Sequence, residues 1–312
     1  MGLRTVKSIP PKCRLGFART LKGALDDVGV SPGDLSCWIR LLVLSLCVLK
    51  TFYPRSNLEC RSADRRLRQE ESVTSAIIVW GSGGSLQLLR VTLDEVPPPF
   101  SVEEELVSGE LNLWQCRRKI CDGHYTAVVR VLSSSDVAPY SDATLLALQD
   151  KHLVAPPPSL PTSPVDHHPL VVSSAVVLDM IRSFPRGTSC GRDGFRAQHL
   201  MDCLGGADVA ISDDLLASIT RVVNLFIEGR CLQPLGEYIA SAPLTSLVKP
   251  GGGICPIVVG TVWRRLVSKV GACLVGPTLS GYFAGLQFGV GVSGGGEAIL
   301  ACLEPVRRGP RW

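Results

Sequence analysis

The sequence predicts a mainly helical α+β fold that contains a single β-hairpin. In the first half of the chain, capping residues stand before apolar segments, a pattern that favours helices. In the second half, apolar residues recur at helical spacing across residues 213–228. Two short runs of strand-forming residues then flank a Pro-Gly-Gly-Gly turn at residues 250–253, as in a β-hairpin.

The composition is that of a folded chain with no strong preference for one class of partner. Of its 312 residues, 46% are hydrophobic and 19% are charged, so the chain can bury a core and wholesale disorder is excluded. The net charge of +4 permits a nucleic-acid partner but does not require one. The 12 cysteines are scattered and no secretory leader precedes them, so we expect free thiols in an intracellular protein of the nucleus or cytoplasm.

Two apolar stretches do not meet the requirements of a membrane span. Residues 41–49 are apolar but are closed by Arg40 and Lys50, and they are far shorter than the roughly 20 residues of a membrane span. Residues 270–296 carry Pro277 and many glycines, which would leave backbone groups unsatisfied in lipid. We therefore expect a buried helix at 41–49 and no association with a membrane.

Capping residues and prolines predict where the helices of the first half begin and end. A capping box at Ser31, with Pro32 at the first helical position, predicts a helix over the apolar residues 38–49. A second helix is expected over residues 59–80. The prolines at 97–99 end the next helix, a second capping box begins at Ser101, and a further helix begins at Ser141.

A stretch rich in proline, residues 155–168, is predicted to link two regions. The helical N-terminal region would cover residues 1–154, and a second region would begin at 169. In the second region we expect a helix over 173–184, a loop with glycines at 187, 191 and 194, and then the helix at 213–228. The hairpin and a helix beginning at Thr261 follow.

Several motifs fail as cofactor or metal sites. Residues 289–294 match GxGxxG, but no acidic residue can follow at the spacing that a dinucleotide site needs. The glycines at 250–253 and 81–84 lack the Lys-Ser/Thr ending of a P-loop, so turn glycines are the better interpretation. Cys116, Cys121 and His124 have no second ligand pair nearby, so no metal site is assigned.

The carboxylates of Ser212-Asp213-Asp214 have two interpretations. Adjacent aspartates hold Mg²⁺ in polymerases, where two-metal phosphoryl transfer needs them. Here they stand directly before an amphipathic helix, where Ser212 fits an N-cap and both aspartates fit a first turn. The cap is the stronger interpretation, and no residue is assigned as catalytic.

Four segments of the second region, in order, carry a family resemblance. Residues 191–195 (GRDGF) resemble a G-x-DG motif, and residues 244–257 (LTSLVKPGGGICPI) resemble a fingers hairpin. Residues 261–269 resemble the helix that follows it, and residues 287–299 resemble a "QFG…AI" segment. Together they resemble the upstream part of reverse transcriptases from non-LTR, LINE-like retrotransposons, especially the degenerate copies in plant genomes.

The resemblance implies roles for five residues. The fingers of such polymerases clamp the triphosphate of the incoming nucleotide, so Lys249 is expected to bind nucleotide. Cys255 replaces the arginine expected beside it, a loss of about 1.5–3 kcal/mol for a charge-assisted hydrogen bond. Arg264, Arg265 and Lys269 are expected to meet nucleic-acid phosphates, with a solvated helix face as the open alternative.

In the family the palm, with its metal-binding aspartates, follows the QFG segment. Here residues 301–312 form a divergent tail in which Pro305 would interrupt a continuing helix. The resemblance therefore implies a truncated, inactive reverse-transcriptase-like protein with residues 169–300 as its fingers-like region. It would bind RNA or DNA weakly and hold no cofactor, since Mg²⁺ is expected only for a complete polymerase.

A second hypothesis comes from a different functional class. The helical N-terminal half would be a protein-interaction module without polymerase function. An apolar face left exposed on the helix at residues 59–80 would favour it.

Overall fold

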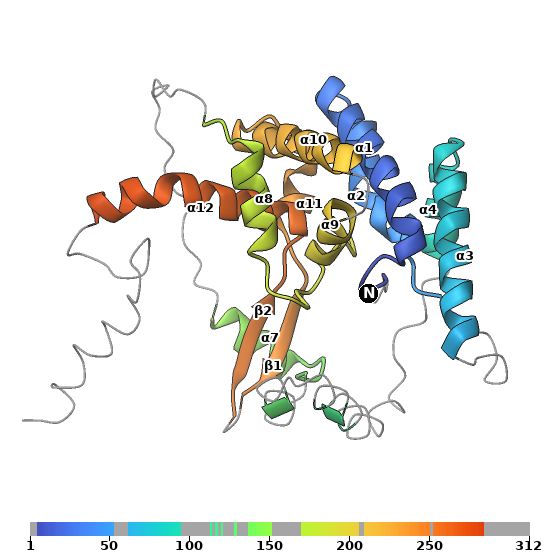
Figure 1. The fold of residues 1–312 in the computed structure, drawn as a ribbon. Coiled ribbons are helices and arrows are strands. Elements are labelled where there is room, and N and C mark those ends of the chain that lie inside the picture. The colour runs from blue at the N-terminus through green and yellow to red at the C-terminus, as the bar shows by residue number, and fades with distance from the viewer. Residues whose placement is uncertain are drawn as a thin grey trace, which may run out of the picture.

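The computed structural model describes residues 5–52, 62–94, 137–151, 170–205, 209–249 and 252–283, together with a few residues between 113 and 129. This part of the chain is mainly helical with one antiparallel hairpin, which confirms the predicted fold class (Figure 1). The Pro-rich linker, the capping box at Ser101, the GxGxxG and QFG segments and the tail lie outside the described residues.

The elements follow one another in a simple order. The first half contains η1 (Pro11–Cys13), α1 (Arg14–Val30), α2 (Leu35–Val48), α3 (Ser62–Gly81), α4 (Ser85–Asp94) and α7 (Asp142–Gln149). The second half contains α8 (Ser174–Arg182), α9 (Ala197–Leu204), α10 (Val209–Ile227), η3 (Gln233–Leu235), α11 (Gly236–Ala240), β1 (Leu244–Val248), β2 (Ile254–Val258) and α12 (Val262–Tyr282).

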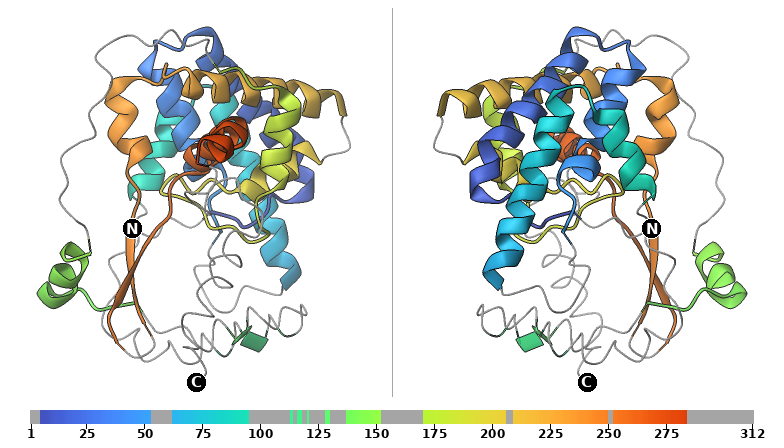
Figure 2. Two further views of the ribbon diagram at one scale, coloured as in Figure 1. Left: turned by 90° about the vertical axis from the view of Figure 1, so that its left-hand side faces the viewer. Right: turned by 90° about the vertical axis from the view of Figure 1, so that its right-hand side faces the viewer.

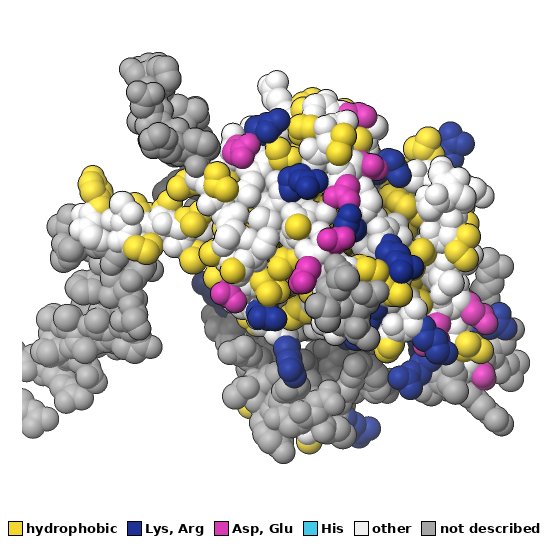
Figure 3. All heavy atoms as spheres, turned by 45° about the horizontal axis from the view of Figure 1, so that its top comes forward, with side chains coloured by type: hydrophobic (Ala, Val, Ile, Leu, Met, Phe, Trp, Pro, Cys, Tyr) yellow, Lys and Arg dark blue, Asp and Glu magenta, His cyan; other side chains and the backbone are white. Residues whose placement is uncertain are grey.

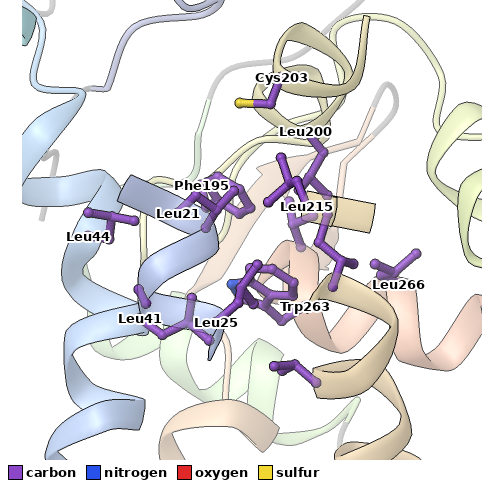
Figure 4. Packing of buried hydrophobic residues seen from close by; sticks show 14 of the residues in the cluster. Leu21, Leu25, Leu41, Leu44, Phe195, Leu200, Cys203, Leu215, Trp263 and Leu266 are labelled. Carbon is purple, nitrogen blue, oxygen red and sulfur yellow. The ribbon is translucent and has the colours of Figure 1, made fainter. Parts of the chain in front are cut away.

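Helices from both halves of the sequence share one hydrophobic core. Side chains of α1, α2, α9, α10 and α12 converge in it (Figure 4). Trp38 of α2 meets Phe226 of α10 edge to face, with ring centroids 5.1 Å apart. Phe195 stacks on Trp263 of α12 at 5.4 Å. Because burial of such large side chains is a main source of stability, α1 and α2 are structural parts of the body that contains the second region.

The interface of α1 with α10 is closed by an ionic network around Asp26. The Asp26 carboxylate lies 2.7 Å from the Lys22 ammonium and 3.6 Å from the Arg221 guanidinium, and Ser218 Oγ donates to it at 2.6 Å. Figure 3 shows acidic and basic side chains intermingled over this face. Opposite charges so interspersed largely cancel, which makes the face a poor binding surface for a polyanion.

The first residues of the chain are fastened to the region around α9. Thr5 Oγ1 donates to the Gly194 carbonyl at 2.6 Å, and His199 Nε2 donates to the Val6 carbonyl at 2.8 Å. The Asp202 carboxylate accepts from the Ile9 N–H at 2.7 Å and pairs with Arg14 at 3.2 Å. These contacts hold the N-terminal segment against α9 and against the loop before it.

Two helix starts differ from the predictions. The N-cap of α2 is Asp34, whose carboxylate accepts from the Ser36 N–H at 2.8 Å, so the capping box at Ser31 was wrong. Ser31 instead ends α1, and Pro32 lies in the intervening turn. In the second half, α10 already includes Ser212, whose Oγ donates to the Cys203 carbonyl at 3.5 Å. Ser212 is therefore not an N-cap.

Other local predictions are confirmed. Ser141 caps α7 by accepting from the Thr144 N–H at 3.2 Å. Helices α3 and α8 match the expected ranges, and α12 begins after Thr261 and continues through Pro277. The stretch at residues 41–49 is buried in α2 and its end, as expected. No helix in the described ranges has the length and apolar character needed to cross a membrane.

Candidate nucleic-acid interface

The hairpin projects away from the helical body, with α7 beside it (Figures 1 and 2). Strands β1 and β2 pair antiparallel, with Leu247 opposite Cys255. The Ala138 N–H donates to the Ser246 carbonyl at 2.8 Å, so the chain before α7 lies along the outer edge of β1. That bond turns the Ser246 carbonyl away from β2, which makes Ser246 and Pro256 a non-hydrogen-bonded pair. Pro256 is thus tolerated because its missing N–H would point to the open edge.

Lys249 lies where β1 ends and the turn begins. Its N–H donates to the Gly253 carbonyl at 2.9 Å, and its carbonyl accepts from the Gly252 N–H at 3.0 Å. Gly252 and Gly253 have φ values of 95° and 83°, a left-handed conformation that glycine adopts without strain. The turn glycines therefore fix the backbone and leave the Lys249 side chain exposed at the tip.

Cys255 shares a face of the hairpin with Lys249. Leu247 and Cys255 are directly opposite, and Lys249 is two residues beyond Leu247, so all three side chains leave the same face. Such diagonal neighbours lie about 7–8 Å apart, within reach of one phosphate chain. A guanidinium at 255 could therefore act together with Lys249, whereas the half-buried thiol adds no charge.

The start of α12 presents the three predicted phosphate-binding side chains in two directions. Thr261 caps the helix, and a buried stripe of Val262, Trp263, Leu266 and Val270 fixes its rotation. Arg264 donates to the Ala240 carbonyl at the end of α11. Arg265 donates instead to the Ser189 carbonyl at 2.6 Å, in the loop between α8 and α9. The structure does not gather the three predicted cations into one patch.

Arg265 and Lys269 share a neighbour in Phe184. The Arg265 guanidinium carbon lies 5.8 Å from the centre of the Phe184 ring, and Lys269 Nζ lies 5.2 Å from it. Partial burial lowers the pKa of Arg265, and the charges of Asp193 and Cys190 oppose that shift. The aromatic face holds both cations near the protein while their remaining donors stay available.

Two cations that the sequence interpretation missed lie on the neighbouring loop. Arg186 and Arg192 are exposed, and the Arg192 guanidinium lies 5.2 Å from the centre of the Tyr238 ring. The loop is held against α12 because Gly191 contacts the backbone of Thr261. We call Arg186, Arg192, Arg265 and Lys269 the basic cluster; none of them forms an ion pair within the described ranges.

One acidic residue lies under the basic cluster. Asp193 is fully buried, and its Oδ1 accepts from the Phe195 N–H at 3.3 Å. Its Oδ2 has no hydrogen-bond partner in the described structure. Burial raises the pKa of Asp193 to about 7, and the Phe195 N–H and the charge of Arg265 oppose that shift. At neutral pH this acid therefore cancels only part of the positive charge above it.

The described residues test the remaining site expectations only in part. Within them, no group of three or more His, Cys, Asp or Glu side chains is arranged to hold a metal ion. Cys116 is buried, while Cys121 and His124 lie outside the described residues. The outer face of α3 exposes Leu67 and Ile78, but the exposed Glu71, Thr74 and Ser75 separate them. That face is therefore not a continuous apolar surface.

Comparison with known proteins shows a distant similarity to a protein of a retrotransposable element. No family model matches the chain, and no solved structure matches it. A stretch of 133 residues is 29% identical to the retrotransposable element SLACS 132 kDa protein of Trypanosoma brucei gambiense. That stretch is 42% of this chain and 11% of the trypanosome protein, so the chain corresponds to a small part of that relative. The chain is thus distantly related, over part of its length, to a retrotransposon protein.

Proposed function

We propose that residues 169–300 are a reverse-transcriptase-like fingers region of non-LTR retrotransposon origin. It binds nucleic-acid phosphates weakly and does not transfer nucleotides on its own. The observation that carries the proposal is the basic cluster, in which the loop between α8 and α9 and the start of α12 pack together and each carries two cations without an ion-pair partner among the described residues. The distant relation to a retrotransposon protein supports the same origin.

The chemistry of the cluster fits a phosphate backbone. Guanidinium groups match phosphate oxygens, and the guanidinium carbons of Arg192 and Arg265 lie 5.2 and 5.8 Å from the centres of aromatic rings. The surface over α1 and α10, where acids and bases alternate, lacks this excess of one sign (Figure 3). Lysine and arginine neutralise phosphate charge but do not hold Mg²⁺, so the proposed function is binding and not catalysis.

The direct test is RNA binding as a function of salt. Fluorescence anisotropy with a labelled single-stranded RNA should give a log–log salt slope that falls by about 0.7 for each phosphate contact removed. We expect Arg192→Ala and Arg265→Ala each to flatten the slope and weaken binding. Arg230→Ala is the matched control, because Arg230 is an exposed arginine that pairs with Glu228 outside the cluster. Equal losses in all three variants would contradict the proposal.

The hairpin is tested separately with a deoxynucleoside triphosphate. Cys255→Arg would restore a cation on the face of Lys249, and binding should strengthen at least about tenfold, since such a bond contributes about 1.5–3 kcal/mol. Val258→Arg adds the same charge on the opposite face of β2 and serves as the control. If both arginines strengthen binding equally, the effect is general electrostatics and the fingers assignment of this hairpin fails.

A further inference from the structure

Asp193 is held rigidly beneath the basic cluster. Its backbone carbonyl accepts from Ser45 Oγ of α2, and the next carbonyl, that of Gly194, accepts from Thr5 Oγ1. Two hydrogen bonds thus hold the backbone directly after the Asp193 side chain. The carboxyl is fully buried, and its Oδ2 has no hydrogen-bond partner in the described structure. Negative charge that approaches such a buried carboxyl favours its protonated form.

The charged and titratable neighbours of Asp193 come from three elements. Arg265 approaches from α12, Tyr238 from α11, and Arg192 and Cys190 belong to the same loop. Burial raises the pKa of Tyr238 to about 12, and the charge of Asp193 adds to this, so the phenol is neutral near pH 7. Cys190 is half-buried on the same loop. Arg265 is therefore the cation whose charge acts on Asp193 and could also act on an incoming phosphate.

We propose that binding of a phosphodiester backbone at Arg192 and Arg265 is coupled to uptake of a proton by Asp193. The inference rests on the binding function proposed above. A phosphate beside Arg265 offsets the positive charge that favours ionisation of Asp193, and it also repels the negative charge of the carboxylate. Both effects favour the protonated carboxyl. Since Asp193 has a pKa of about 7 in the free protein, it is partly ionised at neutral pH and has a proton to gain.

Thermodynamic linkage between proton uptake and binding determines whether affinity rises or falls with pH. If the bound state takes up a proton at Asp193, affinity must fall as pH rises through the range in which Asp193 ionises. If binding raises the pKa of Asp193 by one pH unit, affinity changes by up to tenfold across the range in which Asp193 ionises. We expect the affinity of the wild-type protein to fall about three- to tenfold between pH 6 and pH 8.

The test measures protons directly. Calorimetric titration of the full chain with a short oligouridylate, in two buffers of different ionisation enthalpy at pH 7, gives the number of protons taken up. Uracil and phosphodiesters do not titrate near pH 7, so a sizeable fraction of one proton is expected to come from the protein. Asp193→Asn should abolish the uptake and flatten the pH profile of affinity. Arg265→Gln should bind more weakly and also take up no proton, which covers the case in which Asp193→Asn does not fold.

Two outcomes would overturn the inference in different ways. If the oligouridylate binds but the wild-type protein takes up no proton, or Asp193→Asn keeps the same uptake, the coupling is wrong and the binding function stands. If the oligouridylate does not bind at any pH between 6 and 8, the proposed function is wrong and the coupling falls with it.

Discussion

Gly191→Ala is expected to destabilise the protein because the loop and α12 touch through their backbones at this residue. A Cβ atom at position 191 would lie 2.6 Å from Thr261 Cα, 2.7 Å from Thr261 N and 2.8 Å from the Gly260 carbonyl carbon. Ordinary carbon contacts begin near about 3.5 Å, so the two segments would have to separate by roughly 1 Å. Neither neighbour is a flexible side chain that could move aside.

The size of the effect follows from opposing contributions. Overpacking costs about 1–3 kcal/mol, and contacts with rigid backbone belong at the upper end of that range. Replacing glycine also restricts the unfolded chain, which restores about 0.4–1 kcal/mol. We therefore expect the free energy of unfolding to fall by about 2 kcal/mol, measured by urea denaturation followed by circular dichroism.

Two glycines serve as controls for this measurement. Gly236→Ala lies in α11 with nothing within 4 Å of the added Cβ, so it should be neutral or slightly stabilising. Gly187→Ala also has free space but a φ of 79°, so it should cost about 1–2 kcal/mol through backbone strain alone. A Gly191→Ala protein within about 0.5 kcal/mol of wild type would refute the close contact between loop and helix.

Three further predictions concern the braced N-terminal segment and the core. Burial lowers the pKa of His199 from 6.5 to about 4, so the stability that neutral His199 contributes is complete above pH 6.5 and is lost as pH falls toward 4. The free energy of unfolding from urea titrations should decline by up to about 3 kcal/mol over this range, and His199→Gln should abolish the decline. Asp202→Ala should lower the free energy of unfolding by about 3–5 kcal/mol, because Arg14 and the Ile9 N–H lose their shared acceptor. A loss under about 1 kcal/mol would mean that these contacts do not hold the N-terminal segment against α9. Ile219→Ala, at a fully buried position of α10, should cost about 2–5 kcal/mol by the same assay, and a near-neutral result would mean that α10 does not pack as described.

Local patterns in the sequence were sufficient to predict most helices and the hairpin. Ser141 was recognisable as an N-cap because its side chain acts on a backbone N–H three residues away. The buried face of α10 could also be predicted, since Leu215, Ile219 and Val222 repeat at helical spacing and all are buried. In such cases the deciding interaction lies within a few residues of the pattern.

The errors arose where two local patterns competed or where the partner was distant. Ser31 fits an N-cap in the sequence, but in the structure it ends α1, and Asp34 caps α2. Ser212 resembled a cap because an acidic pair followed it, yet α10 begins before it. The role of Arg192 in the basic cluster could not be predicted, because it depends on a contact between its loop and residues about 70 positions away.

Two of the segments that resemble the reverse-transcriptase family, residues 191–195 and 261–269, contact each other in the structure. Gly191 contacts Thr261, and Phe195 stacks on Trp263, so the GRDGF loop holds the start of α12 directly. Strand β2 leads into that helix through three residues, so the same contact sets where the hairpin leaves the body. The position of Lys249 relative to the basic cluster is therefore determined by the loop and not by the hairpin alone. A loss of nucleotide binding in a variant at Phe195 or Trp263 would consequently report a displaced hairpin, whereas a loss in Lys249→Ala would report a missing charge.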